Sequence, residues 1–192
     1  MPEDRDQQAP VDPEGRGRSS GPSGPGAAGS GPDPLPGQAG GPLERIELTS
    51  PAFDDGDVLP SRFAHDRENL SPPLEWGDVP PGTQEQALLC QDPDAPSGLF
   101  THWVLAGIDP TITAIDEGEM PPGSVAGLND FGEVGWGGPE PPRGHGPHRY
   151  VFTLFAASEP LDLTQGASAD DLLEALDGVE LAQGSLLGRY ER

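Results

Sequence analysis

The chain has 192 residues, with 33 Asp and Glu against 10 Arg and no Lys, so its formal charge at pH 7 is −23. Such a surface repels the phosphate backbone of nucleic acids, which excludes nucleic-acid binding as an expected function. Repulsion among so many carboxylates is screened at molar salt, where the Debye length falls to about 3 Å, so the composition favours a protein adapted to a salty cytoplasm.

Residues 1–42 are predicted to be a disordered tail. They are built largely from Gly, Pro, Ser, Gln and acidic residues, and they cannot bury enough apolar surface to offset the entropy of ordering. From Leu43 onwards, short apolar runs alternate with Pro/Gly turns. Residues 43–192 carry 27 of the 33 acidic residues and 7 of the 10 Arg, a net charge of −20. This segment is predicted to be the single folded domain.

Several short strands are predicted along this domain. Ile46 and Leu48 alternate with polar neighbours, residues 87–90 form a short apolar run, and residues 102–108 have the pattern of a buried strand. Residues 150–156 are apolar at both odd and even positions, which predicts a central strand that is covered on both sides.

One helix is predicted late in the chain. Ser168 and Asp171 form a capping-box-like start, and an apolar stripe of leucines, Leu172, Leu173 and Leu176, precedes Gly178. Short strands with frequent turns and a single late helix indicate a mainly β fold, a β-sandwich with a peripheral helix, rather than alternating β/α units.

The compartment is predicted from three features. The single Cys90 cannot form an intrachain disulfide and fits a reducing environment. No stretch approaches the roughly 18 apolar residues of a transmembrane helix, and the N-terminal residues lack the apolar segment of a signal peptide. We therefore expect a cytoplasmic protein without stable membrane insertion. An acidic protein from a host of ordinary salt is the alternative to a halophilic one.

Four polar segments lie at the ends of apolar strands, where a pocket can collect them. They are DPDAP (residues 92–96), THWV (101–104), the Gly/Pro-rich loop GGPEPPRGHGPH (137–148) and the strand start HRY (148–150). Strand alternation predicts that His148 and Tyr150 share one face. The glycines of the loop would allow backbone N–H groups to converge on an anion. Turns and ordinary core packing are the competing interpretation of all four.

These segments, in this order, resemble the phosphatidylethanolamine-binding protein family in its bacterial and archaeal Raf-kinase-inhibitor-like branch. Further segments that resemble that branch are SPAF (50–53), NLSPPLEW (69–76), GLNDFG (127–132) and LGRY (187–190), so the resemblance covers roughly residues 43–192. It implies a β-sandwich of two antiparallel sheets with a small pocket for phosphate-like or carboxylate anions. The pocket residues that the resemblance implies are Asp92, Asp94, His102, Pro141, Pro142, His148 and Tyr150.

The expected chemistry of that pocket is anion binding. A carboxylate would hold an imidazole in one tautomer, and the other ring nitrogen would donate to an anion oxygen alongside loop N–H groups. Expected partners are a small phosphorylated or carboxylate ligand, a lipid head group or a protein. The resemblance implies that a protein partner would be a kinase or a protease that this chain inhibits, although the Raf label itself is not carried over. No cofactor, metal ion or catalytic residue is assigned.

Three residues depart from the pattern of that branch. Glu140 stands where many members have Cys, and we interpret it as pointing outward. Val179 stands where a His is common, and Arg67 stands where a glycine turn is common. His145 is expected to be a solvent-facing loop residue rather than a ligand of the pocket or of a metal.

Two other functions remain open. The first is a hydrolase in which His102 or His148 acts as a general base for water, although Ser97 lies in no recognisable nucleophile motif. The second is a metal site formed by Asp92, Asp94 and the histidines, which is poorer in Cys and His than structural zinc sites usually are.

Overall fold

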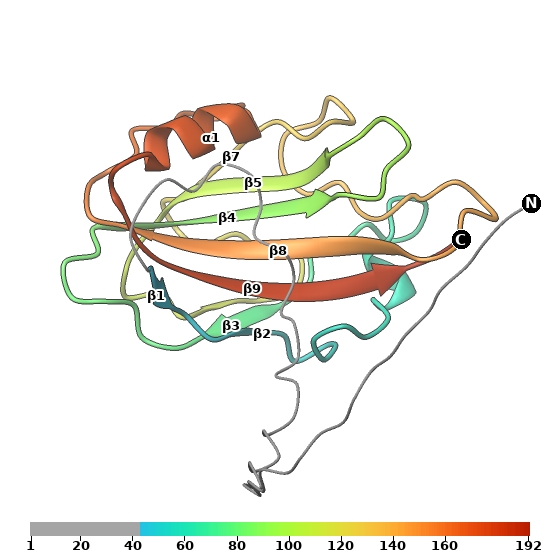
Figure 1. Ribbon diagram of the computed structural model, residues 1–192, viewed down its shortest axis with the longest axis horizontal. Helices are drawn as coiled ribbons and strands as arrows, with labels where there is room; N and C mark the ends of the chain where they lie inside the picture. The colour runs from blue at the N-terminus through green and yellow to red at the C-terminus, as the bar shows by residue number, and fades with distance from the viewer. Residues whose placement is uncertain (1–42) are drawn as a thin grey trace, which may run out of the picture. The chain divides into compact units, whose positions relative to one another are not determined.

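The structure is a computed structural model, and it describes residues 43–192. The predicted disordered tail, residues 1–42, lies outside the described residues. A six-stranded sheet has the order β1-β9-β8-β4-β5-β7, and a three-stranded sheet has the order β2-β3-β6 (Figure 1). The elements are β1 (Glu44–Arg45), β2 (Leu48–Thr49), a 3-10 turn (Ser61–Phe63), β3 (Leu74–Trp76), β4 (Glu85–Asp92), β5 (Phe100–Ile108), β6 (Ala114–Ile115), β7 (Val125–Ala126), β8 (His148–Ala157), α1 (Ala169–Leu176) and β9 (Glu180–Tyr190).

The β-sandwich expected from the sequence is confirmed. The large sheet lies between the small sheet on one side and α1 on the other (Figure 1). All neighbouring pairs are antiparallel except β1 with β9, which is parallel. The main core fills the space between the two sheets, and a second apolar cluster fills the space beneath α1.

Strand β8 is the predicted strand with two buried faces. It pairs with β4 on one side and with β9 on the other. Phe152 and Leu154 belong to the core between the sheets, whereas Phe155 and Ala157 belong to the cluster under α1. Side chains in a strand point alternately to opposite faces, so a strand between two apolar layers needs apolar residues at every position.

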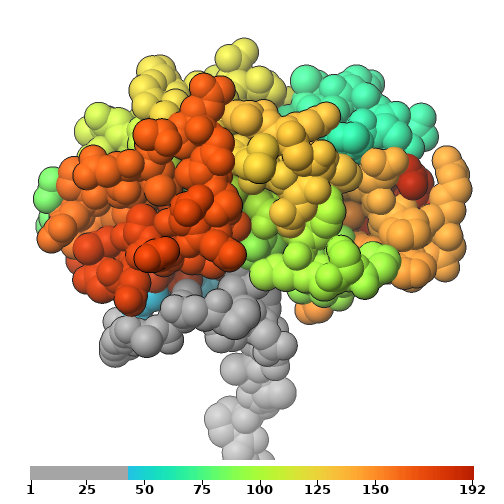
Figure 2. Space-filling view, turned by 90° about the horizontal axis from the view of Figure 1, so that it is seen from above, coloured from blue at the N-terminus to red at the C-terminus, as the bar shows by residue number. Residues whose placement is uncertain are grey.

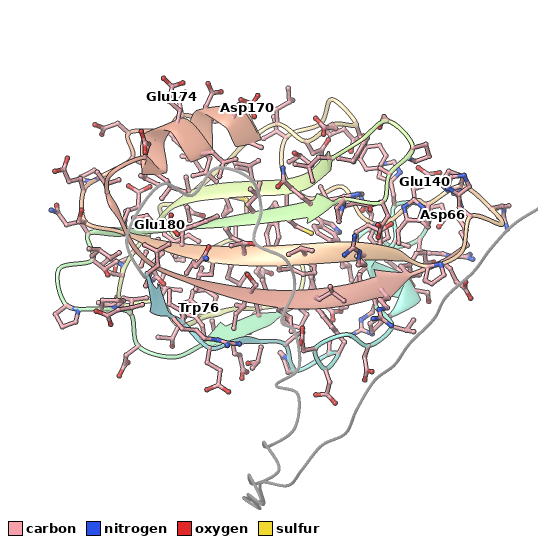
Figure 3. All side chains as sticks on the ribbon, in the orientation of Figure 1. Asp66, Trp76, Glu140, Asp170, Glu174 and Glu180 are labelled. Carbon is pink, nitrogen blue, oxygen red and sulfur yellow. The ribbon has the colours of Figure 1, made fainter. Side chains whose placement is uncertain are left out.

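Helix α1 has the capping box that its sequence predicts. The Ser168 hydroxyl accepts from the backbone N–H of Asp171, whose carboxylate accepts from the backbone N–H of Ser168. A cap of this kind stabilises a helix by about 1 kcal/mol. Leu172 and Leu176 are buried against the sheet. The charged side chains of the opposite face point away from the sheet in Figure 3, where Asp170 and Glu174 are labelled. Within the described part of the chain, no helix is long and apolar enough to cross a membrane.

Candidate functional site

A cavity of about 150 Å³ lies at one end of the large sheet. Strand β4 ends there, and the antiparallel β5 and β8 begin there, so three strand ends supply side chains to the same space. The turn after β4 and the Gly/Pro-rich loop before β8 form the rest of the wall. In Figure 2 the yellow-green segment near residue 97 and the orange segment near residue 142 are seen on one face. The lining residues are Asp92, Ala95, Pro96, Ser97, Phe100, His102, Phe131, Glu140, Pro141, Pro142, His148 and Tyr150.

Asp92 and His148 form a buried pair in this wall. Nδ1–H of His148 donates to Oδ2 of Asp92 at 2.7 Å, and the other carboxylate oxygen accepts from the backbone N–H of Asp94 at 2.7 Å. Both side chains are about 4 % exposed. The carboxylate therefore fixes the proton of the neutral imidazole on Nδ1, and Nε2 carries a lone pair. The expected donation from the second nitrogen to an anion therefore requires His148 to be an imidazolium, and it stays a prediction.

His102 is turned towards the cavity by a β-bulge. Cys90 pairs with Trp103 and Gln91 pairs with Thr101, so His102 is the extra residue of β5 at this point. As a result His102 and Trp103, although adjacent, both contact the ring of Trp136, with centroid separations of 6.4 and 5.6 Å. A regular strand would have sent these two side chains to opposite faces.

The imidazole of His102 is held as a neutral ring. Its Nδ1–H donates to the carbonyl oxygen of Gly137 at 2.6 Å, because a carbonyl can only accept. Burial lowers the pKa of His102 below its ordinary value of 6.5. The hydrogen bonds of 2.6 and 2.7 Å that orient the rings of His102 and His148 both use Nδ1, so Nε2 is the other polar atom of each ring. Both histidines therefore present an acceptor nitrogen when they are neutral.

Tyr150 is the donor of the site. Its side chain is fully buried, it lines the cavity, and no group among residues 43–192 forms a hydrogen bond with its hydroxyl. Burial, together with the nearby charge of Asp92, raises the pKa of Tyr150 above its ordinary value, so the phenol keeps its proton at physiological pH. A buried hydroxyl without a partner loses about 1–3 kcal/mol, so a ligand that accepts from it would recover that free energy.

Asp94, which the resemblance placed in the pocket, is not a lining residue. Its carboxylate accepts from the backbone N–H, Nε–H and Nη2–H of Arg149, each at 2.9 Å. These hydrogen bonds to Arg149 lower the pKa of Asp94. Asp94 therefore anchors the start of β8 to the turn after β4, and its carboxylate is committed to Arg149.

Two glycines of the Gly/Pro-rich loop use their backbone N–H groups for hydrogen bonds within the protein. Gly137 and Gly138 donate to the carbonyl of His102 and to Oδ1 of Asn69, respectively, at 2.9 and 2.8 Å. The loop residues that line the cavity are Glu140, Pro141 and Pro142. Proline has no N–H, so this wall is mainly an apolar surface.

Glu140 does not point outward as we interpreted it from the sequence. It lines the cavity, and both of its oxygens are engaged. Nη1–H of Arg192 donates to Oε1 at 2.7 Å, and Nδ1 of His65 lies 3.0 Å from Oε2. Figure 3 labels Glu140 and Asp66 close together, and the same Nη1 of Arg192 lies 3.4 Å from Asp66.

The remaining polar candidates lie as follows. His145 is exposed, with its ring centroid 5.7 Å from that of His148. Ser97 lines the cavity although no sequence motif marked it. Among residues 43–192, no group of three or more His, Cys, Asp or Glu side chains is placed to hold a metal ion, so the metal alternative gains no support.

Comparison with known proteins gives a consistent result. A family model described as "Phosphatidylethanolamine-binding protein" matches residues 49–191. A "UPF0098 protein" of Methanothermobacter thermautotrophicus is 47 % identical over 152 residues, which are 77 % of this chain and 99 % of that protein. A crystal structure of the PEBP homolog CT736 from Chlamydia trachomatis has a TM-score of 0.72 and 35 % identity, covering 78 % of this chain and 99 % of that one. YbcL of E. coli, described as a member of the mammalian PEBP family, has a TM-score of 0.73 and 30 % identity, covering 77 % and 98 %.

Proposed function

Because the chain belongs to the phosphatidylethanolamine-binding protein family, we propose that its cavity binds an anionic group, a phosphate or a carboxylate, and that the domain is a binding module. The group would belong to a small phosphorylated molecule, a lipid head group or a segment of a protein partner. We propose binding without chemical conversion of the ligand as the leading function. Localisation in a salty cytoplasm stays a prediction from the composition.

The hydroxyl of Tyr150 is the observation that carries this proposal. It is a protonated donor inside a cavity, and it lacks an acceptor within the described residues. Buried polar groups in native proteins are nearly always satisfied, and a group that is not satisfied points to a missing ligand or water. An anion oxygen at this position would supply the acceptor.

His148 supports the proposal through its carboxylate partner. Its Nε2 is an acceptor in the neutral ring, so an anion oxygen would approach it only with a proton between them. The 2.7 Å hydrogen bond from Nδ1 to Asp92 fixes the orientation of the ring, so Nε2 is the ring atom left for a ligand. Nε2 would donate to an anion oxygen when it carries a proton, and it would accept from a protonated ligand oxygen when it does not.

Long-range attraction contributes little to this binding. The cavity lining includes no Arg or Lys, and the domain as a whole repels anions. Affinity would come from short-range hydrogen bonds at Tyr150 and His148 and from apolar contacts with the prolines and phenylalanines of the wall. The apolar part of the wall suits a ligand that carries carbon next to its anionic group.

Hydrolysis is the second candidate function, and one observation favours it. The Asp92 and His148 pair leaves Nε2 as a base that faces the cavity, which is the arrangement of an oriented general base. Ser97 lines the same cavity, but no hydrogen bond joins its hydroxyl to either pocket histidine among the described residues. The binding module remains the better supported proposal.

A calorimetric titration of the full chain in molar KCl tests the leading proposal. Phosphate, phosphoethanolamine and acetate would be compared with glycerol as an uncharged control. We expect saturable binding of at least one anion, and loss of that binding in His148→Ala. If none of the anions binds to the folded wild-type protein, the proposal is wrong. Release of product from a phosphate or carboxylate ester, abolished in His148→Ala, would instead establish the hydrolase.

A further inference from the structure

Glu140 is an acidic residue in the lining of a cavity that is proposed to bind anions. Among the described residues that line that cavity, two are acidic, Asp92 and Glu140, and none is Arg or Lys. The carboxylate of Asp92 accepts a hydrogen bond from His148, which also lines the cavity. The two groups that hold the oxygens of Glu140, Arg192 and His65, do not line the cavity, so no positive group stands between Glu140 and a bound ligand in the described lining.

The charge of Glu140 is only partly compensated. Arg192 is shared between Glu140 and Asp66, with distances of 2.7 and 3.4 Å from the same Nη1. The imidazole of His65 is shared in the same way. Its Nδ1 contacts Glu140, and its Nε2 lies 3.7 Å from Oε2 of Glu133. Asp66 also lies 3.8 Å from Nε of Arg67, so the three carboxylates share two guanidinium groups and one imidazole. With a neutral imidazole the cluster keeps a net charge of about −1 near the cavity.

The position of Glu140 is fixed as well as its charge. The ring of His65 stacks on Phe131 with a centroid separation of 4.2 Å and an interplanar angle of 12°. Phe131 lines the cavity and packs edge-on against Phe100 at 4.8 Å. Glu140 is thus bonded to a ring that is itself packed into the wall. Its carboxylate cannot swing away from an incoming ligand without breaking these contacts.

We infer that Glu140 is the specificity-determining residue of this cavity and that it selects singly charged anions, such as carboxylates, phosphodiesters and sulfate esters, over doubly charged phosphate monoesters. The inference rests on the proposed anion-binding function. Its physical reason is that repulsion by a fixed charge grows in proportion to the charge of the ligand. A second negative charge on the ligand meets no additional cation in this wall.

Methyl sulfate and methyl phosphate are matched probes for this inference. Each carries one methyl group and three terminal oxygens, and they differ in charge. At pH 8, about two units above the second pKa of a phosphate monoester, methyl phosphate is a dianion, whereas methyl sulfate is a monoanion. Acetate and dimethyl phosphate, measured beside them, distinguish a carboxylate ligand from a phosphodiester ligand.

The dissociation constants of these probes would be measured by calorimetry on the full chain at one constant salt concentration. We expect wild type to bind methyl sulfate about tenfold more tightly than methyl phosphate, and Glu140→Gln to reduce this ratio to about twofold. The glutamine can still accept from Arg192, and a thermal unfolding curve checks its fold. Glu133→Gln removes a carboxylate of the same cluster that does not line the cavity, and it should leave the ratio within about twofold of wild type.

Arg192→Gln provides an independent variant. It removes the cation that compensates Glu140, so the preference for methyl sulfate should rise above the wild-type ratio. An unchanged ratio in Glu140→Gln, or a lower ratio in Arg192→Gln, would overturn the inference while leaving anion binding intact. If wild type binds neither probe and neither phosphate nor acetate, the proposed function fails, and the inference fails with it.

Discussion

Asp92 and His148 are 56 positions apart in the sequence, yet a 2.7 Å hydrogen bond joins their side chains. Both residues are almost completely buried. The pairing of β4 with β8 brings the end of one strand beside the start of the other. The bond fixes the orientation of the ring, and in the neutral imidazole it assigns the proton to Nδ1. This pair connects the register of the sheet to the proposed function.

Replacement of Asp92 by Asn tests the charge of this pair. The amide oxygen can still accept from Nδ1–H, but it no longer stabilises an imidazolium. We expect the affinity for phosphate, measured by calorimetry, to fall by about tenfold with a stability loss of about 1–2 kcal/mol. Asp94→Asn is the matched control, because Asp94 does not line the cavity. Equal losses of affinity in the two variants would contradict a special role for Asp92.

Glu180, at the start of β9, should make the domain less stable at neutral pH. Burial raises its pKa to about 7 from an ordinary value of 4.5, and its Oε1 atom is buried without a hydrogen-bond partner. The unfolded chain releases this proton near pH 4.5, whereas the folded chain holds it to about pH 7, so stability is lost as the pH rises through that window. Because the side chain is only half-buried, the loss is about 1 kcal/mol. Glu180→Gln should raise the unfolding temperature at pH 8 and leave it unchanged at pH 4. An equal shift at both pH values would contradict this origin.

Gly184 should be intolerant of any side chain. A Cβ atom at this position would collide with the backbone carbonyl of Ile46, where the chain crosses from β1 to β2. Gly184→Ala is therefore expected to destabilise the domain by about 2–3 kcal/mol in denaturant unfolding. Gly77 has open space around it and an ordinary backbone conformation. Gly77→Ala should change stability by less than about 0.5 kcal/mol, and a comparable loss in both variants would contradict the steric explanation.

Glycines within β9 explain why this strand was not predicted from the sequence. Strand β9 has 11 residues, yet no apolar pattern predicted it, because Gly184 and Gly188 interrupt it. Gly188 packs against Leu59, where an added Cβ would lie 2.6 Å from the leucine side chain. By contrast β8 and α1 were predicted because their signals are local. An apolar run and a capping box each lie within a few consecutive residues.

The sequence predicted which residues line the cavity better than it predicted how their side chains are oriented. The family resemblance indicated Asp92, His102, His148, Tyr150 and the two prolines, and all of these line the cavity. The orientation of His102 depends on a bulge in the pairing of β4 with β5, and no local pattern in the sequence marks that bulge. The direction of Glu140 depends on Arg192, 52 residues further along the chain. Such long-range contacts leave no periodic signal in the sequence.

The most direct test of the account is Tyr150→Phe, measured for both stability and binding. Removal of a buried hydroxyl that lacks a partner within the described residues should stabilise the free domain by about 1 kcal/mol, and the same change should weaken phosphate binding by about tenfold, because the ligand loses a buried neutral donor. A gain in unfolding temperature together with a loss of affinity is the predicted result. A variant that binds phosphate as tightly as wild type would contradict the proposed anion site.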